Sequence, residues 1–261
     1  MPNKEMTFWD HLDELRRLIF RCLGVVVILA TGLFIWMPDL FDQVILGPCF
    51  GRFPIYTWFC SLSRFVTLPS SFCDPTFEIG IINIELTSQF LIHIQISLIL
   101  AAVLMFPYIL FELWRFISPA LYDKEKKSIR FSFILGALLF YVGILVSYWL
   151  IFPITLRFLA GYQISGHVLN QLSLNSYMTT FISLNLIFGL VFEMPMLAMI
   201  LSKLGLIGRS FFRKWRRHAI VTLVFLAALI TPTGDPFTLA LVSIPLYLLY
   251  ELSAILVRND I

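Results

Sequence analysis

The sequence predicts an all-α integral membrane protein with six transmembrane helices and both termini on the inner side of the membrane. Hydrophobic residues make up 59% of the 261-residue chain, and charged residues make up 13%, about half the share typical of soluble domains. Sixteen of the 19 Lys and Arg residues fall in four short segments between or beside apolar runs. These segments are 1–21, 115–130, 203–217 and the C-terminal tail. Because loops on the cytoplasmic side retain Lys and Arg, the pattern predicts orientation as well as class.

Stretches without charged residues place the six spans. A spanning helix needs about 20 predominantly apolar residues, and several of these stretches reach that length. Together they predict one polytopic domain over residues 1–261, with spans at about 18–38, 86–111, 130–152, 176–202, 217–233 and 236–256. The first apolar run is expected to stay as a signal-anchor, because several charges precede it and no small-residue cleavage site follows it.

An amphipathic helix is expected over residues 5–17, ahead of the first span. Its apolar residues recur at helical spacing, and its charged residues occupy the other faces. The apolar set is Phe8, His11, Leu12, Leu15, Leu18 and Ile19, and the charged set is Asp10, Asp13, Glu14 and Arg17. Such a helix would lie on the inner surface and run into the span.

A long outer loop is expected over residues 39–85. It holds four prolines and three cysteines, Cys49, Cys60 and Cys73. On the oxidising side of the membrane these cysteines permit one disulfide and leave one thiol over, so the spacing does not assign the pairing.

The last two spans are short. Their charge-free stretches, 218–234 and 236–250, reach about 25 and 22 Å, against a hydrocarbon core of about 30 Å. A turn with two prolines separates them and holds Asp235. A short hairpin that thins the bilayer fits this pattern, whereas one long kinked span would place Asp235 in mid-membrane.

Glu193 is the only acidic residue expected deep in a span. A charge at that depth costs roughly 2.5–3.5 kcal/mol on insertion scales, so the carboxyl is either neutral and hydrogen-bonded within the bundle or faces water or a partner. Nearby Pro195 frees the carbonyl of Val191, which needs another donor.

Gln89 and His93 lie four residues apart in the second span and share a helix face. Interhelical hydrogen bonding is one interpretation. The other is a proton relay from His93 to Glu193, which would suit a proton-coupled small-molecule transporter.

Acidic residues also stand in the basic inner segments, where topology requires none. Glu14 precedes Arg16 and Arg17, and Glu125 lies among Lys124, Lys126 and Lys127. Carboxylates bind guanidinium groups through paired hydrogen bonds, so two of them side by side could bind a pair of arginines on a ligand. Local ion pairing with the neighbouring cations is the alternative.

No enzyme chemistry is indicated. The sequence supplies no nucleophile with a base, no phosphate-binding loop and no Cys/His spacing for a metal, so neither a cofactor nor a metal is expected. Glu193 lacks an acidic or lysine companion at its depth, which argues against an intramembrane enzyme. The formal net charge of +3 resides in orienting loops beside anionic lipid and indicates no nucleic-acid partner.

Six motifs, in order from residue 11 to 251, carry a resemblance to the TatC family, the multispanning core of the twin-arginine protein translocase. They are His11-Leu-x-Glu14-Leu15-Arg16; Trp114-x-Phe-Ile-x-Pro119-Ala-Leu121-Tyr122 with Glu125; Phe140-Tyr141-x-Gly143; Phe192-Glu193-x-Pro195; Thr231-Pro232 with Asp235; and Pro245-Leu-x-x-Leu-Tyr-Glu251. The ordered set on a six-span frame is specific.

The resemblance implies a cupped, concave bundle with two short final helices. Glu14 and Glu125 would receive the arginine pair of a signal peptide. Glu193 would face the concave groove, where Gln89 and His93 are further candidates for contact with a partner helix. Pro48 would lie in the outer loop that caps the groove.

The function implied is that of a receptor and scaffold rather than an enzyme. Members of this family bind twin-arginine signal peptides on folded cargo and assemble with single-span subunits of the TatA/TatB type, driven by the proton-motive force. The chain would be one of several copies in a hetero-oligomeric complex. A bacterial inner membrane is the default location.

Overall fold

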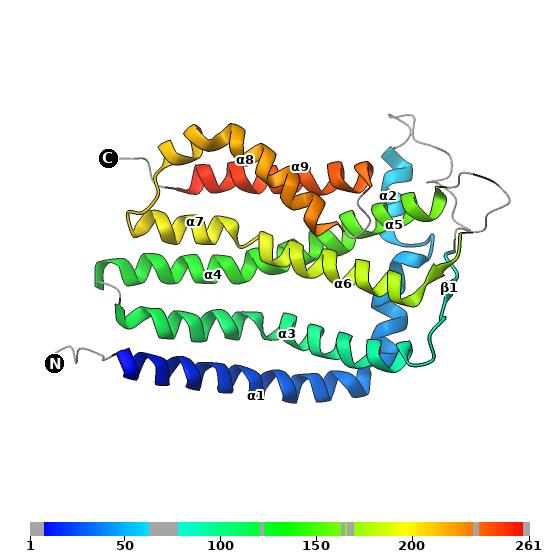
Figure 1. Cartoon of the computed structure of the whole chain (residues 1–261), viewed down its shortest axis with the longest axis horizontal. Helices are drawn as coiled ribbons and strands as arrows, with labels where there is room; N and C mark the ends of the chain where they lie inside the picture. Colours follow the sequence, from blue (N-terminus) through cyan, green and yellow to red (C-terminus); the bar gives the residue numbers. More distant parts are fainter. Residues whose placement is uncertain are drawn as a thin grey trace.

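The computed structural model describes residues 8–62, 78–120, 123–162, 165, 170–231 and 235–257. Long helices lie side by side along the long axis of the molecule, and α1 begins at the same end at which α9 finishes (Figure 1). The longer helices are α1 (Phe8–Leu40), α3 (Ser88–Ile117), α4 (Asp123–Val146), α6 (Leu174–Val191), α8 (Arg209–Ile230) and α9 (Pro236–Leu256). The shorter ones are α2 (Pro54–Leu62), α5 (Phe152–Gly161) and α7 (Met194–Lys203).

Helix α1 is continuous over 33 residues. The expected amphipathic helix 5–17 and the first span are therefore one helix within the described residues. The apolar and charged faces of residues 8–17 keep the same helical repeat as the span that follows, and no Pro or Gly interrupts them.

Part of the expected outer loop 39–85 is folded. Helix α1 runs on into a π-helical turn, η1 (Phe41–Ile45), and a 3₁₀ turn, η2 (Gly47–Cys49), before α2. Further on, the strand β1 (Ile81–Ile82) pairs in parallel with β2 (Leu172–Ser173). Backbone groups at this end of the bundle are thereby hydrogen-bonded.

The third and fourth expected spans also differ in detail from single helices. Helix α4 continues through a π-helical turn, η5 (Ser147–Ile151), into α5. The expected helix 176–202 is broken into α6 and α7 at Phe192 and Glu193, where the Glu193 N–H bonds to the Leu190 carbonyl at 3.1 Å. Pro195, in the first turn of α7, cannot donate a backbone hydrogen bond, and this explains the break.

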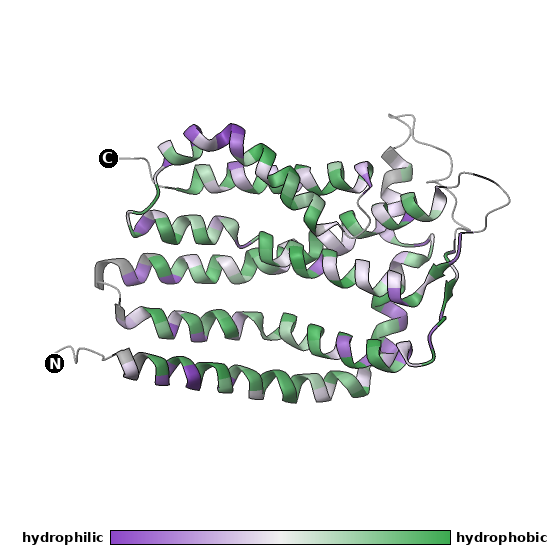
Figure 2. Cartoon of the chain, in the orientation of Figure 1, coloured by the Kyte–Doolittle hydropathy of each residue, from purple (hydrophilic) through white to green (hydrophobic). Residues whose placement is uncertain are grey.

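Five helical segments of the described residues are long and apolar enough to cross a membrane. They are Leu12–Cys49, Ser88–Ile117, Ile129–Gly161, Leu174–Lys203 and Pro236–Leu256. Green, hydrophobic residues surround their middle portions (Figure 2). Helix α8, which contains most of the expected span 217–233, is not among them, because its first half is basic. The all-α membrane fold is confirmed, and the count of six spans stays a prediction.

Glycines let α4 approach α6 and α7 closely. A Cβ atom at Gly143 would lie 2.7 Å from the Phe188 carbonyl oxygen, and one at Gly136 would overlap the Met196 sulfur. Small residues at such contacts replace the hydrophobic driving force that lipid does not provide. The fully buried aromatic side chains Phe140, Phe152, Tyr177 and Phe188 fill the centre of the packing.

Candidate functional site

The end of the bundle at which α1 begins, which the sequence predicts to be the inner end, is the first candidate. Helix α1 starts at this end, and so does α4, which follows the 3₁₀ turn η4 (Ser118–Ala120) at the end of α3 (Figure 1). Glu14 and Leu15 are half-buried on α1, whereas Arg16 and the η4 residue Pro119 are exposed.

Several predicted residues at the inner and outer turns lie outside the described part of the chain. These are Leu121, Tyr122 and Pro232. For two others, His11 and Glu125, the structure describes the helical backbone only.

The level of Glu14 along the bundle follows from an ion pair on the same wall. Arg21 Nη1 on α1 lies 3.1 and 3.3 Å from the two carboxylate oxygens of Glu112 on α3. Glu14 precedes Arg21 by seven residues, which is about 10 Å along the helix axis and nearly the same helix face. Since α3 runs in the opposite direction, Glu14 is level with η4 at the end of α3 (Figure 1). Helix α4, which contains Glu125, begins shortly after η4.

Sequence reasoning missed Glu112. Glu112 is 4% exposed, and its carboxylate accepts a further hydrogen bond from the Tyr108 hydroxyl at 3.1 Å. The available signal was its place immediately after the charge-free stretch 86–111, at the end of the second expected span. The contact between Arg21 and Glu112 shows that the wall formed by α1 and α3 can hold a guanidinium group against a buried carboxylate.

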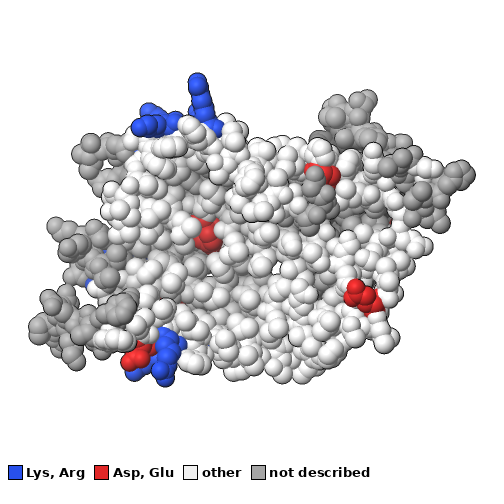
Figure 3. Space-filling view, in the orientation of Figure 1, with Lys and Arg blue, Asp and Glu red and all other residues white. Residues whose placement is uncertain are grey.

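Glu193 lies at the break between α6 and α7 and is 6% exposed. Neither of its carboxylate oxygens has a hydrogen-bond partner among the described residues. Gly136 of α4 leaves room for it, because a Cβ atom there would lie 2.7 Å from Glu193 Oε2. Figure 3 shows one small group of acidic atoms near the middle of this face, surrounded by uncharged residues. The adjoining Pro195 is buried.

Gln89 and His93 line one cavity of about 720 Å³ between the outer ends of α1 and α3. The imidazole of His93 stacks on Phe34, with ring centroids 3.9 Å apart, and its Nε2 lies 2.9 Å from the Phe34 carbonyl oxygen. Glu193 is not among the described residues that line this cavity. The structure therefore brings Gln89 and His93 together but gives no support to a relay from His93 to Glu193.

At the outer end Pro48 is buried beneath α2. Its carbonyl accepts a hydrogen bond of 2.8 Å from the Tyr56 hydroxyl, which also lies 3.2 Å from the Pro153 carbonyl. The buried guanidinium of Arg157 stands 4.5 Å from the centre of the Tyr56 ring. Burial raises the pKa of Tyr56, and nearby Arg157 lowers it less, so the phenol stays a donor.

The cysteines and Asp235 have structural surroundings. Cys49 is a buried free thiol and Cys60 is disulfide-bonded, whereas Cys73 lies outside the described residues. The carboxylate of Asp235 caps the start of α9 by accepting from the Thr238 N–H at 2.7 Å. Within the described residues no group of His, Cys, Asp and Glu is arranged to hold a metal ion.

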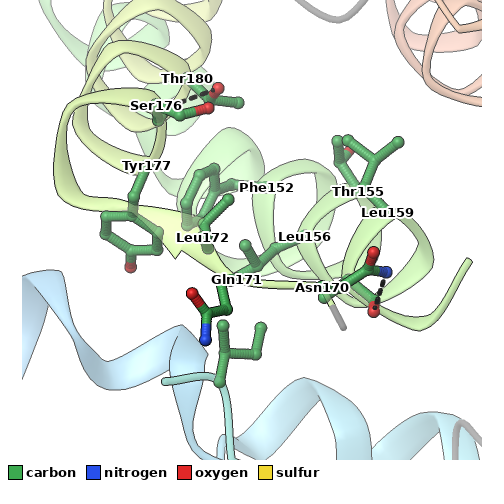
Figure 4. Close-up of a pocket in the computed structure, with 12 residues that line it drawn as sticks. Phe152, Thr155, Leu156, Leu159, Asn170, Gln171, Leu172, Ser176, Tyr177 and Thr180 are labelled. Atoms are coloured by element: carbon green, nitrogen blue, oxygen red, sulfur yellow. Dashed lines mark hydrogen bonds between the residues drawn. The ribbon is translucent and has the colours of Figure 1, made fainter. Parts of the chain in front are cut away.

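A smaller cavity of about 350 Å³ lies between α5 and α6 near β2. Figure 4 shows Phe152, Thr155 and Leu156 of α5 on one side and Ser176 and Tyr177 of α6 on the other. The buried Thr155 hydroxyl has no hydrogen-bond partner among the described residues. None of the predicted site residues lines this cavity.

Comparison with known proteins supports the resemblance. Residues 10–245 match the family model for the Sec-independent protein translocase protein (TatC). A protein of that name from Blattabacterium sp. subsp. Periplaneta americana is 34% identical over 95% of this chain and 94% of its own. Another from Deinococcus radiodurans is 34% identical over 96% of this chain and 85% of its own.

The fold comparison agrees with these matches. A crystal structure described as the twin arginine translocase receptor TatC in DDM superimposes with a TM-score of 0.75. It is 29% identical in sequence, and the match covers 95% of this chain and 99% of that one.

Proposed function

The chain belongs to the TatC family of Sec-independent protein translocase proteins, and from this premise we propose that it binds twin-arginine signal peptides of folded cargo at the inner membrane face. As a translocase component it acts in protein transport rather than as an enzyme. The proposed binding groups are the carboxylates of Glu14 and Glu125.

The observation that carries the proposal is the common level of Glu14 and the start of α4. Packing of α1 on α3 places Glu14 level with η4, and Glu125 is the third residue of the helix that follows. Two acidic residues more than a hundred positions apart in sequence thus belong to the same end of the bundle. Two carboxylates are what a pair of consecutive arginines requires.

Arginine should be preferred over lysine. A guanidinium group offers two parallel N–H donors that match the two oxygens of a carboxylate, whereas an ammonium is a compact point charge. The ion pair of Arg21 and Glu112 supports an arginine ligand at this end, since the same helix wall already pairs a guanidinium nitrogen, Nη1, with both oxygens of a carboxylate.

After capture, Glu193 would contact a polar residue of a partner helix or an inserted signal peptide. Its buried carboxylate lacks a hydrogen-bond partner among the described residues, so a polar group from another chain would relieve its desolvation. The partners would be single-span subunits of the TatA/TatB type, within a complex that holds several copies of this chain and uses the proton-motive force. Gln89 and His93 would lie at the outer end of the same assembly surface.

The proposed location is a bacterial inner membrane, with both termini in the cytoplasm. The basic segments at the inner ends of α1, α4 and α8 support this orientation. On the outer side, the capping loop would include buried Pro48 and the folded turns around it.

The test is binding of the purified full chain, in mild detergent, to a fluorescent twin-arginine signal peptide and to its twin-lysine counterpart. We expect a clear arginine preference that Glu14→Gln and Glu125→Gln each weaken by about tenfold, the loss of one charge-assisted hydrogen-bonded pair. Glu78→Gln, an exposed acid at the outer end, serves as the control. Equal affinity for both peptides, or equal loss in the control, would reject the proposed site.

A further inference from the structure

Helix α8 carries a basic face at its inner end. We define the basic face of α8 as Arg213, Lys214 and Arg217, all exposed. Figure 3 shows Lys and Arg atoms gathered over this part of the molecule. The spacing i, i+1 and i+4 makes Arg213 and Lys214 both neighbours of Arg217, with Cβ atoms about 5–6 Å from it, so the three cations can reach one anion.

These three cations have no ion-pair partner among the described residues. Arg216 lies between them in sequence but points elsewhere, and its Nε donates to Glu251 of α9 at 2.6 Å. Helix α9 therefore neutralises one cation of α8 and leaves the basic face open. An anion from outside the chain has space to bind there.

Toward the C-terminal end of α8, beyond the basic face, the same side of the helix becomes apolar. Val221 and Phe225, which follow Lys214 by seven and eleven residues, are 70% and 72% exposed. These spacings keep all three on one helix face. Figure 2 shows this change from hydrophilic to hydrophobic residues along α8. Trp215, beside the basic face, is 45% exposed, as is common at the membrane–water interface.

The apolar part of α8 is too short for an undeformed bilayer. Residues 218–230 extend about 20 Å, whereas the hydrocarbon core is about 30 Å thick. The headgroup layers of the two leaflets must therefore be closer together beside α8 than elsewhere in the bilayer. This thinning brings the inner headgroups level with the basic face of α8.

We propose that the basic face of α8 binds an anionic phospholipid, with the phosphate held by Arg213, Lys214 and Arg217 and an acyl chain lying along Val221 and Phe225. This site is separate from the signal-peptide site and does not depend on it. A lipid suits the surface better than an acidic protein segment, because the charge and the apolar stripe meet on one face at membrane depth.

The test is native mass spectrometry of the full chain, which counts bound phosphatidylglycerol against phosphatidylcholine. The triple variant Arg213→Gln, Lys214→Gln, Arg217→Gln should bind phosphatidylglycerol at least about tenfold more weakly. The matched control is Arg115→Gln, Lys127→Gln, Arg130→Gln, which removes three exposed cations from α3 and α4 at the same end. It should retain the lipid. Equal loss in both variants, or no loss in the α8 variant, would overturn the proposal.

A second arm separates the lipid from a free phosphate. Phe225→Ser removes apolar contact and keeps all three cations, so it should weaken phosphatidylglycerol binding while leaving competition by glycerol phosphate unchanged. If Phe225→Ser has no effect and glycerol phosphate displaces the lipid at equal concentration, the site is one for soluble anions. Preferential retention of an acidic peptide over phosphatidylglycerol would also contradict the lipid assignment.

Discussion

The ring of His93 on α3 donates a hydrogen bond to the backbone carbonyl of Phe34 on α1, across 2.9 Å. Phe34 stands four residues before Pro38, which has no N–H to offer that carbonyl. Because a carbonyl oxygen only accepts, His93 Nε2 carries the hydrogen. In lipid an unsatisfied carbonyl is costly, so the histidine replaces the bond that proline removes.

The same relationship recurs at two further prolines. Pro107 frees the carbonyl of Val103, which lies 3.2 Å from the Tyr141 hydroxyl. Pro48 stands four residues after Val44, whose carbonyl accepts from the Tyr148 hydroxyl at 2.7 Å. Aromatic donors on neighbouring helices thus stabilise proline-containing helices in this fold.

Replacing His93 with Phe tests the hydrogen bond to the Phe34 carbonyl. The variant keeps an aromatic ring against Phe34 but leaves the carbonyl unpaired, so we expect a loss of about 1–3 kcal/mol in stability. Pro38→Ala restores an N–H to α1, so His93→Phe should cost less in that background. Thermal unfolding of the two single variants and the double variant in detergent measures the coupling. Additive effects would show that the two residues act independently.

Replacing Gly136 with Ala should disturb Glu193. The added methyl would overlap the Met196 sulfur and lie 2.7 Å from Glu193 Oε2, so we expect a destabilisation of about 1–3 kcal/mol. Gly24→Ala is the matched control, because nothing lies within 4 Å of its new methyl group. It should leave the melting temperature equal or higher. Equal melting temperatures for both variants would show that α4 and α7 can separate freely.

Removing Arg21 should leave the Glu112 carboxylate buried beside Tyr108 alone. Since the Arg21 side chain is 39% exposed, Arg21→Leu should cost roughly 1–2 kcal/mol rather than the larger penalty of a fully buried pair. The double variant Arg21→Leu, Glu112→Leu should be more stable than Arg21→Leu. Chemical denaturation of the parent, of Arg21→Leu and of the double variant gives the three stabilities, and a double variant less stable than Arg21→Leu would contradict an ion pair.

Tyr56 should make the outer end sensitive to alkali. In the unfolded chain a phenol loses its proton near its ordinary pKa of 10.0, whereas burial raises the pKa of Tyr56 in the folded chain. Its contribution to stability is therefore complete below pH 10 and declines as the pH rises above it. Melting temperatures between pH 8 and about 11 should fall less steeply in Tyr56→Phe than in the parent. Tyr162→Phe, at an exposed tyrosine, should follow the parent.

Glu193→Ala should separate capture from assembly. If Glu193 contacts a partner helix, the variant should bind twin-arginine peptide normally and accumulate to normal abundance but recover less single-span partner in affinity purification. Leu190→Ala, at an exposed neighbour in the same span, serves as the control. A fall in abundance of Glu193→Ala would instead indicate a purely structural role.

Much of the organisation of this protein could be predicted from its sequence. Hydropathy and the distribution of Lys and Arg are local properties, and bilayer insertion sums them along the chain. They predicted the apolar spans, and the ordered motifs from His11 to Glu251 predicted the family. The turn with two prolines that holds Asp235 predicted where the last two helices separate.

Other relationships depended on the tertiary structure. Glu112 meets Arg21 across 91 residues, His93 meets Phe34, and Gly136 makes room for Glu193. A membrane helix is apolar on most of its faces, so its sequence does not determine which face turns toward a neighbour or at what height. Packing at small residues and pairing of buried polar groups decide both, because lipid provides no hydrophobic force between helices.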